Sequence, residues 1–182
     1  KSTLLPGTTM KLQAEFPKLF VMHSPEFLRE TNAAHDASHP DRNIIGLPKE
    51  NEEFIRRGEQ VMAILPKAPY QCIISAFEAE LVKYAGNCFL YTKVLFTNAL
   101  YDLVKATGGD WNDIRDAMIH DPRIGPSHTE PVHVSGHDRQ KSRAVRGAGG
   151  HCFIKDFEAF RGYVQKEVKN DVLHDMLSKM ID

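Results

Sequence analysis

The longest apolar pattern in the chain covers residues 76–107 and contains no proline. Gly108 and Gly109 follow it, which is a typical signal for the end of a helix. We therefore predict one long helix, which at 1.5 Å per residue would span roughly 45–50 Å. Its apolar residues are spread around most of the circumference, so we expect neighbouring elements, including part of a second subunit, to cover nearly every side.

One face of this predicted helix carries a polar stripe. Glu80, Lys83 and Asn87 follow each other at intervals of three and four residues, so they share a face. A buried ammonium group is costly unless it is paired. One interpretation is a structural Glu80–Lys83 pair, with Asn87 holding a neighbouring loop. The other is a site on a rigid helix, in which Lys83 stabilises an oxyanion and Asn87 donates a hydrogen bond to the same atom. The pattern leaves both open.

Before the long helix, residues 1–74 alternate between short apolar runs and amphipathic segments. We predict strands at residues 2–7, 19–22, 43–47 and 70–74. We predict helices at residues 8–16, with Thr8 or Thr9 as the N-cap, at 25–30 and at 51–64, and a polar loop at 36–42. Strands that alternate with helices favour an α/β fold with a partial doubly wound (Rossmann-like) parallel sheet. Because no Gly-x-Gly-x-x-Gly fingerprint is present, we interpret this part as the second half of such a sheet.

After residue 75 the pattern is helical only, which predicts an all-helical domain. Besides the long helix, we predict helices at residues 110–120, with Asp110 as the N-cap, at 156–169 and at 171–180. The stretch 121–150 is rich in Gly, Pro, His and Arg and has no periodicity; loops of this length are functional or disordered. The chain therefore divides into two domains, 1–74 and 75–182.

The composition is that of a globular protein: 182 residues, 42% hydrophobic, 26% charged, with a net charge of -1. Without a basic excess we expect no nucleic-acid partner, and without a long apolar run we expect no membrane association. Three cysteines without paired spacing indicate free thiols in a reducing compartment, so we expect a cytoplasmic protein. Since the chain starts at Lys1 and in a predicted strand, we expect it to be part of a longer protein.

A glycine-rich segment at residues 147–156 contains the third cysteine. Cys152 stands at the start of a predicted helix, with Lys155 nearby and Asp156 within reach. These are the conditions for an activated thiolate nucleophile. The alternative is a buried cysteine beside a glycine turn, which is the preferred interpretation of the other two cysteines, since both lie inside apolar runs.

Four histidines, at positions 120, 128, 133 and 137, raise the question of a metal site. Zinc ligands usually come in closely spaced pairs on turns or helices, and these histidines lie in or beside an irregular stretch without a cysteine pair. We expect no metal.

Six short motifs occur in a fixed order: Ser-Thr-x-x-Pro-Gly-Thr at residues 2–8, Pro-Glu-Phe-Leu-x-Glu at 25–30, Pro-Asp-Arg-x-x-x-Gly at 40–46, Ala-Glu-x-x-Lys-x-x-x-Asn at 79–87, Asp-x-Arg-Ile-Gly at 121–125 and Gly-Gly-x-Cys-Phe-x-Lys-Asp at 149–156. This order resembles the UDP-glucose/GDP-mannose 6-dehydrogenase family. The resemblance covers nearly the whole chain.

The resemblance implies an enzyme that oxidises the C6 alcohol of a nucleotide sugar, UDP-glucose above all, to the carboxylate with two NAD per turnover. Residues 1–74 would be the C-terminal half of the NAD-binding domain, and residues 75–182 the helical central domain that dimerises and carries catalytic residues. It also implies a homodimer through the long helix at about residues 76–107. With the rest of the NAD domain and the nucleotide-sugar domain outside this chain, we expect the chain alone to be inactive.

The resemblance also implies roles for single residues. Cys152 would be the nucleophile that forms a thiohemiacetal and then a thioester, Lys83 and Asn87 would stabilise the oxyanion, Asp156 and Thr3 would order the catalytic water, and Glu26 would assist proton transfer. The implied substrate-binding residues are Glu26, Phe27, Leu28, Glu30, Lys83, Asn87, Arg123, Arg143, Gly147 and Gly149, with Arg123 reaching the sugar site of the neighbouring subunit. The implied cofactor-binding residues are Ser2, Thr3, Glu30, Cys152 and Lys155.

Other assignments stay open. A β-hydroxyacid dehydrogenase relative also places Lys and Asn four residues apart on a central helix, but its chemistry needs no cysteine nucleophile. A non-catalytic dimerisation module is the alternative from another class. His151 and Ile154 differ from the residues of many relatives, and the role of residues 126–142 is open. The sugar nucleotide could be UDP-glucose, GDP-mannose or a UDP-N-acetylhexosamine.

Overall fold

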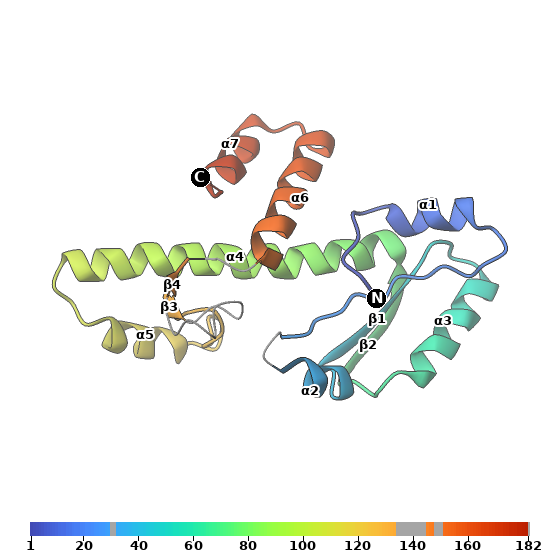
Figure 1. The fold of residues 1–182 in the computed structure, drawn as a ribbon, viewed down its shortest axis with the longest axis horizontal. Coiled ribbons are helices and arrows are strands. Elements are labelled where there is room, and N and C mark those ends of the chain that lie inside the picture. The colour runs from blue at the N-terminus through green and yellow to red at the C-terminus, as the bar shows by residue number, and fades with distance from the viewer. Residues whose placement is uncertain (30–31, 134–144, 148–150, 182) are drawn as a thin grey trace. The chain divides into compact units, whose positions relative to one another are not determined.

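A computed structural model describes residues 1–29, 32–133, 145–147 and 151–181 (Figure 1). The chain forms two compact units, Lys1–Ala85 and Gly86–Asp182, which are described separately. No helix among the described residues combines the length and the hydropathy that a membrane span requires.

The centre of the first unit is a β-α-β arrangement. Strands β1 (Arg42–Leu47) and β2 (Tyr70–Ser75) pair in parallel, and helix α3 (Glu52–Ile64) connects them and packs against both (Figure 1). Asn51 caps α3 by accepting a hydrogen bond from the Phe54 N–H at 3.0 Å. These elements agree with the predicted boundaries and confirm the partial Rossmann-like sheet.

Glycine at position 46 allows the close approach of β1 to the first turn of the long helix. A Cβ atom at Gly46 would lie 2.7 Å from the Ala79 Cβ and 2.8 Å from the Ala76 Cα. On the other edge of β1, Gly46 exchanges two backbone hydrogen bonds with His23, at 2.9 and 2.6 Å. The β1 strand is therefore held on both sides at a position where no larger residue fits.

Two predicted strands are not formed in the first unit. Residues 2–5 belong to no strand and residues 6–7 form a turn, and residues 19–22 belong to no strand either, although His23, which follows them, forms a bridge with Gly46. An apolar run becomes a strand only where a neighbour accepts its backbone hydrogen bonds, and within the described residues neither segment has a continuous one. Sequence pattern does not report that condition.

The helix predicted at 8–16 is formed, but its predicted N-cap, the helix predicted at 25–30 and part of the loop predicted at 36–42 were wrong. Helix α1 (Thr8–Glu15) has Gly7 as its N-cap, in place of the expected Thr8 or Thr9. The carboxylate of Glu80 accepts hydrogen bonds from the N–H groups of Gly7 and Thr9, so no threonine hydroxyl is needed as a cap. Residues 25–29 are not helical, whereas the predicted loop 36–42 begins with the end of helix α2 (Ala33–Ser38). Residues 30–31 lie outside the described part of the chain.

Helix α4 (Ala76–Ala106) confirms the long helix to within one residue. Its residues 76–85 belong to the first unit and residues 86–106 to the second. Helix α5 (Trp111–Ile119) follows with the predicted Asp110 as its N-cap, whose side chain accepts a hydrogen bond from the Asn112 N–H at 2.7 Å. The capping and stop signals were therefore sufficient here.

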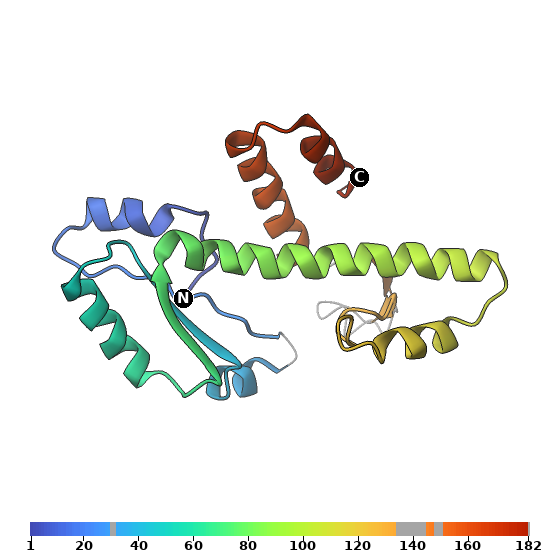
Figure 2. The same cartoon turned by 180° about the vertical axis from the view of Figure 1, so that it is seen from behind.

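Two short strands and two helices follow α5 in the described part of the second unit. Strands β3 (Val132–His133) and β4 (Val145–Arg146) form a short antiparallel pair that the sequence did not predict. Helix α6 (His151–Glu167) begins five residues before the predicted start, and helix α7 (Asp171–Lys179) agrees with its prediction. Figure 2 shows α6 and α7 side by side.

The core of the second unit lies where α6 and α7 meet α4. Its buried side chains are Cys88, Tyr91, Phe157, Val164 and Leu177. Among the described residues, one face of α4 is exposed, and the second subunit expected to cover part of this helix stays a prediction. Phe89, Phe96 and Leu103, which follow each other at intervals of seven residues, have exposed fractions of 70%, 63% and 59%. We call these three residues the α4 stripe.

Candidate active site

Lys83 connects α4 with the segment that contains Glu26. Its Nζ donates a hydrogen bond to the Glu26 carbonyl oxygen at 2.6 Å and lies 5.5 Å from the centre of the Phe27 ring. All three side chains are half-buried. The fold therefore brings Lys83 to Glu26 and Phe27, two other predicted site residues that lie more than fifty positions earlier in the sequence.

Glu80, one turn earlier on α4, has a structural role. Its buried carboxylate accepts hydrogen bonds from the Gly7 N–H at 2.5 Å, the Thr9 N–H at 2.8 Å and the Thr9 hydroxyl at 2.6 Å. A carboxylate at a helix N-terminus satisfies unpaired amides and interacts favourably with the helix dipole. These three hydrogen bonds are sufficient to explain the burial of the Glu80 carboxylate, so an ion pair with Lys83 is not required. The Lys83 ammonium instead binds the carbonyl oxygen of Glu26.

Two cations hold the Glu26–Phe27 segment from other directions. The Lys1 Nζ lies 3.7 Å from the Glu26 carboxylate, and the Arg42 guanidinium lies over the Phe27 ring at 3.6 Å. Ser2 and Thr3 follow Lys1 directly, so the predicted cofactor-side residues neighbour the predicted substrate-side residues in the first unit. Leu28 is exposed, and Glu30 lies outside the described residues.

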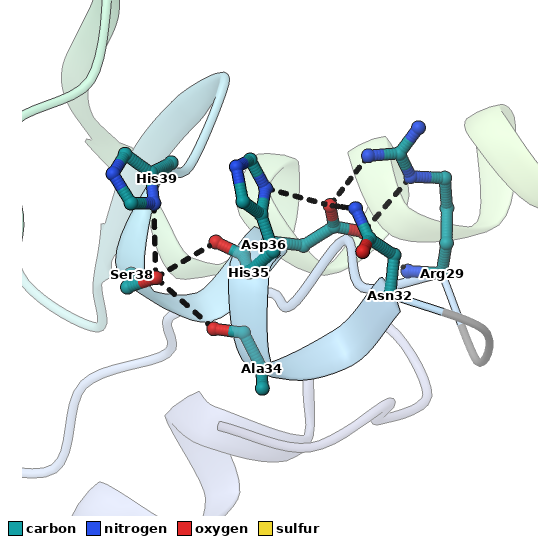
Figure 3. A network of polar contacts seen from close by, with 7 residues as sticks. All are labelled: Arg29, Asn32, Ala34, His35, Asp36, Ser38 and His39. Carbon is teal, nitrogen blue, oxygen red and sulfur yellow. Dashed lines mark hydrogen bonds and ion pairs between the residues drawn. The ribbon is translucent and has the colours of Figure 1, made fainter.

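Asp36 of α2 binds Arg29, which follows Glu26 by three residues (Figure 3). Its carboxylate accepts hydrogen bonds from the Arg29 backbone N–H at 2.9 Å, from the Arg29 guanidinium through two nitrogens, and from the Asn32 amide at 3.2 Å. These hydrogen bonds hold the pKa of Asp36 well below its usual value, and the bond from the Arg29 side chain is the largest cause. The sequence analysis missed Asp36 because α2 is too short to show periodicity; the opposite charges of Arg29 and Asp36 were the available signal.

In the second unit, Asn87 and Lys155 converge on Asp156. The Asn87 Nδ2 donates to one carboxylate oxygen of Asp156 at 2.5 Å, and the Lys155 ammonium binds the other oxygen. Asp156 is 1% exposed, whereas the Lys155 side chain extends to the surface. A buried carboxylate with two donors is held in one orientation, from which it can order a further polar group.

Cys152 is the second residue of α6 and precedes Asp156 by about one turn. Its side chain lies outside the described part of the structure. Gly147, with a φ of +91°, forms a bend directly after β4 that glycine adopts without strain. The other two predicted residues of this stretch, Arg143 and Gly149, also lie outside the described residues.

The structure does not bring Arg123 to the other site residues of the second unit. Its side chain is 87% exposed and pairs with Asp121 at 2.6 Å in a tight turn. Lys93 of α4 holds this turn by donating to the Ile124 carbonyl oxygen at 2.7 Å and to that of Gly125 at 3.2 Å. The sequence analysis did not single out Lys93, although a lysine inside a largely apolar helix was an available signal.

Residues 77–180 match the central domain of the UDP-glucose/GDP-mannose dehydrogenase family, and residues 1–65 match its NAD-binding domain. The chain belongs to this family. The resemblance of the six motifs is thereby confirmed, and the domain match confirms NAD as the cofactor of this domain.

Individual members of the dehydrogenase family agree with the domain matches. The UDP-glucose 6-dehydrogenase of Rickettsia conorii is 33% identical over 169 residues, which are 91% of this chain and 35% of that enzyme. A UDP-glucose dehydrogenase structure from the archaeon Pyrobaculum islandicum is 32% identical, with a TM-score of 0.77 over 100% of this chain and 40% of that one. The GDP-mannose dehydrogenase of Pseudomonas aeruginosa is 25% identical, with a TM-score of 0.57 over 99% and 39%. The chain therefore spans less than half the length of each.

The first unit has the architecture in which this dehydrogenase family holds its dinucleotide. In open parallel sheets, ligands bind beyond the carboxyl ends of the strands. Leu47 and Ser75 are register partners at those ends of β1 and β2. A dinucleotide bound to this unit would therefore lie beyond Leu47 and Ser75. For metals, the described residues contain no group of three or more His, Cys, Asp or Glu side chains that could hold an ion.

Proposed function

We propose that this chain supplies catalytic residues for the NAD-dependent oxidation of a nucleotide sugar, UDP-glucose in the first place, from the C6 alcohol to the carboxylate. The observation that carries the proposal is the convergence of Asn87 and Lys155 on the buried Asp156, one turn beyond Cys152 in α6. A cluster that only stabilised the fold would need no cysteine one turn away. Oxidation of an aldehyde through a covalent intermediate does need a nucleophile such as Cys152.

In the proposed reaction, Cys152 binds the C6 aldehyde covalently. The thiolate adds to the aldehyde carbon, so a sulfur–carbon bond forms and the carbonyl oxygen takes up the negative charge. Lys83 and Asn87, one turn apart on the same face of α4, stabilise this oxyanion. After the second oxidation the acid is held as a thioester. Water ordered by Asp156 and Thr3 then attacks the thioester carbon, and the carbon–sulfur bond breaks to release the carboxylate and Cys152.

The structure supports a division of roles between the donors. Asn87 donates one amide hydrogen to Asp156, and its second amide hydrogen is the one assigned to the oxyanion. The Lys83 ammonium has three hydrogens, one of which binds the Glu26 carbonyl oxygen. This bond holds Glu26 beside Lys83, where we assign its carboxylate to proton transfer.

NAD would accept a hydride from C6 in each of the two oxidations. On the side of this chain, Ser2, Thr3 and Lys155 are the described residues assigned to holding it. Lys1, which directly precedes Ser2 and Thr3, lies 3.7 Å from the carboxylate of Glu26, the proposed proton-transfer residue.

Three further proposals concern organisation. We assign residues 1–74 to the NAD-binding domain and residues 75–182 to the central domain. We propose a homodimer through α4, supported by the exposed α4 stripe. We also propose a cytoplasmic location, supported by the free thiols of Cys72 and Cys88.

A chimaera tests the proposed function. Residues 1–182 would replace the matching segment of the Rickettsia conorii UDP-glucose 6-dehydrogenase. We expect NADH formation with UDP-glucose and NAD, at two NADH per sugar, and no NADH from this chain alone. Lys83→Met should lower kcat by about 10²–10³-fold, because it removes an oxyanion donor. Cys152→Ser should abolish carboxylate formation, whereas Cys72→Ser is the matched control and should retain it.

The same assay separates the alternatives. A β-hydroxyacid dehydrogenase would yield one NADH per turnover and would not depend on Cys152. A non-catalytic module would give no NADH in the chimaera, although the chain would still dimerise. Full activity of the Cys152→Ser chimaera would contradict the proposed mechanism.

A further inference from the structure

The guanidinium of Arg146 binds three residues of α4. Its Nη1 lies 2.8 Å from the Asp102 carboxylate, its Nε donates to the Asn98 side-chain oxygen at 3.2 Å, and its Nη2 donates to the Asn98 carbonyl oxygen at 3.3 Å. Its Cζ lies 4.9 Å from the centre of the Tyr101 ring. The hydrogen bond from Arg146 also lowers the pKa of Asp102. A planar group that is bound along its edges and on one face cannot be replaced by the point charge of a lysine.

The α4 residues that receive Arg146 are themselves held in place. The Asn98 Nδ2 donates to the Val94 carbonyl oxygen at 2.9 Å, which turns the amide oxygen toward Arg146. The Tyr101 ring packs edge-on against the buried Trp111, with 5.4 Å between ring centres. The binding place on α4 is thus preorganised, so little side-chain freedom is lost when Arg146 binds.

Arg146 is the last residue of β4 and precedes the proposed nucleophile, Cys152, by six positions. Its backbone pairs with Val132 of β3, and the bend at Gly147 follows directly. Helix α6 begins five residues after Arg146 and carries Cys152 in its first turn. The contact to Asn98 spans 48 positions in the sequence, so it ties the end of β4 to a distant, rigid element.

We propose that Arg146 is a positioning residue for Cys152. The proposal rests on the proposed function, in which Cys152 is the nucleophile. By fastening the end of β4 to α4, Arg146 fixes the point from which the chain enters α6, and with it the orientation of the first turn of that helix. Arg146 lies between Arg143 and Gly147, which were expected to bind substrate, but its side chain is directed at α4. Its role is therefore to hold the chain and not to bind the sugar.

Charge alone does not account for this role. Arg146 and Asp102 form a pair whose net charge is close to zero, and Lys105 lies 5.5 Å from the same Tyr101 ring. A variant that removes both members of the pair leaves the net charge unchanged. A variant with lysine at position 146 keeps the cation but loses the planar contacts.

The test measures the alkylation rate of Cys152 by iodoacetamide against pH, with the modified peptide quantified by mass spectrometry. The proteins are the wild type, R146K, the double variant R146M/D102N and the control R161K. Arg161 pairs with Glu158 at 3.6 Å and contacts α7, so its substitution alters a matched ion pair elsewhere in the unit. Thermal melts of all four proteins report their folding.

We expect the wild-type thiol to titrate below the ordinary cysteine range and R161K to match it. Both position-146 variants should titrate about one pH unit higher, so alkylation below the apparent pKa slows by about tenfold. An unchanged pH profile in both variants, with folded protein, overturns the positioning role and leaves the proposed function intact. An ordinary titration of the wild-type thiol overturns the proposed function and the positioning role together.

Discussion

Asn87 of α4 and Asp156 of α6 lie 69 positions apart in the sequence and are joined by a hydrogen bond of 2.5 Å. Because the Asp156 carboxylate is buried and its two oxygens accept from Asn87 and Lys155, replacing one oxygen by an amide NH2 group should leave one of these two donors without an acceptor. We expect Asp156→Asn to lower the free energy of unfolding by about 1–3 kcal/mol. The matched control is Asp175→Asn, an exposed member of an ion pair with Lys179, which should cost about 0.5 kcal/mol or less. Equal effects in urea unfolding would contradict a buried anchoring role of Asp156.

Gly46 should tolerate no side chain. A methyl group there would collide with the Cα of Ala76 and the Cβ of Ala79. Neither atom can rotate away, because the backbone of the first turn of α4 fixes both. We expect Gly46→Ala to destabilise the first unit by about 1–3 kcal/mol or more. Gly162→Ala is the control, since Gly162 lies within α6 with open space around its Cα, and it should be neutral or stabilising by up to about 1 kcal/mol. Circular dichroism melts of both variants decide the matter; a stable Gly46→Ala variant would show that β1 does not approach α4 this closely.

His23 should make the first unit sensitive to acid. Burial, countered in part by the charge of Glu80, lowers the pKa of His23 below 6.5. The unfolded chain therefore binds a proton before the folded chain does, so stability is complete above pH 6.5 and is lost as the pH falls below it. We expect His23→Gln to flatten the pH dependence of urea unfolding between about pH 7 and 5. The exposed His120, changed to Gln, should leave that dependence as in the wild type.

Cys88 should be inert while the protein is folded. Burial, with the Asp156 charge as a second cause, raises the pKa of its thiol from 9.0 to about 12. We expect no alkylation of Cys88 at neutral pH before unfolding, whereas the half-buried Cys72 should react in the folded state. Since the folded state favours the neutral thiol, stability should also fall as the pH rises above 9.0. Alkylation of Cys88 at the rate of Cys72 would contradict this packing.

The α4 stripe should hold the proposed homodimer together. A carboxylate in an apolar contact between two helices loses its hydration without gaining a partner, so Phe96→Asp should shift the chain toward monomer. Val172→Asp is the control, because Val172 is 81% exposed on α7 and lies outside the stripe. Sedimentation equilibrium of the three proteins measures the effect. Dimerisation that survives Phe96→Asp would place the interface elsewhere.

The sequence determined the elements whose signals are local. The long α4, the cap residue Asp110 and the β1-α3-β2 unit follow from periodicity, capping chemistry and apolar runs, and the structure has them within a residue or two of the predicted ends. The order of six motifs likewise determined the family. These features depend on neighbours along the chain, so the chain itself reports them.

Tertiary structure decided what depends on distant partners. Whether residues 2–5 or 19–22 pair as strands depends on a neighbouring backbone, and the acceptor for the N-terminal amides of α1 is Glu80, more than seventy positions away. The same holds within the site. Sequence spacing placed Glu80, Lys83 and Asn87 on one face, but only the fold assigned Glu80 to α1, Lys83 to the Glu26 carbonyl and Asn87 to Asp156. A polar residue on a helix face seeks whichever donor or acceptor folding brings to it, and that choice is made by the packing of remote segments.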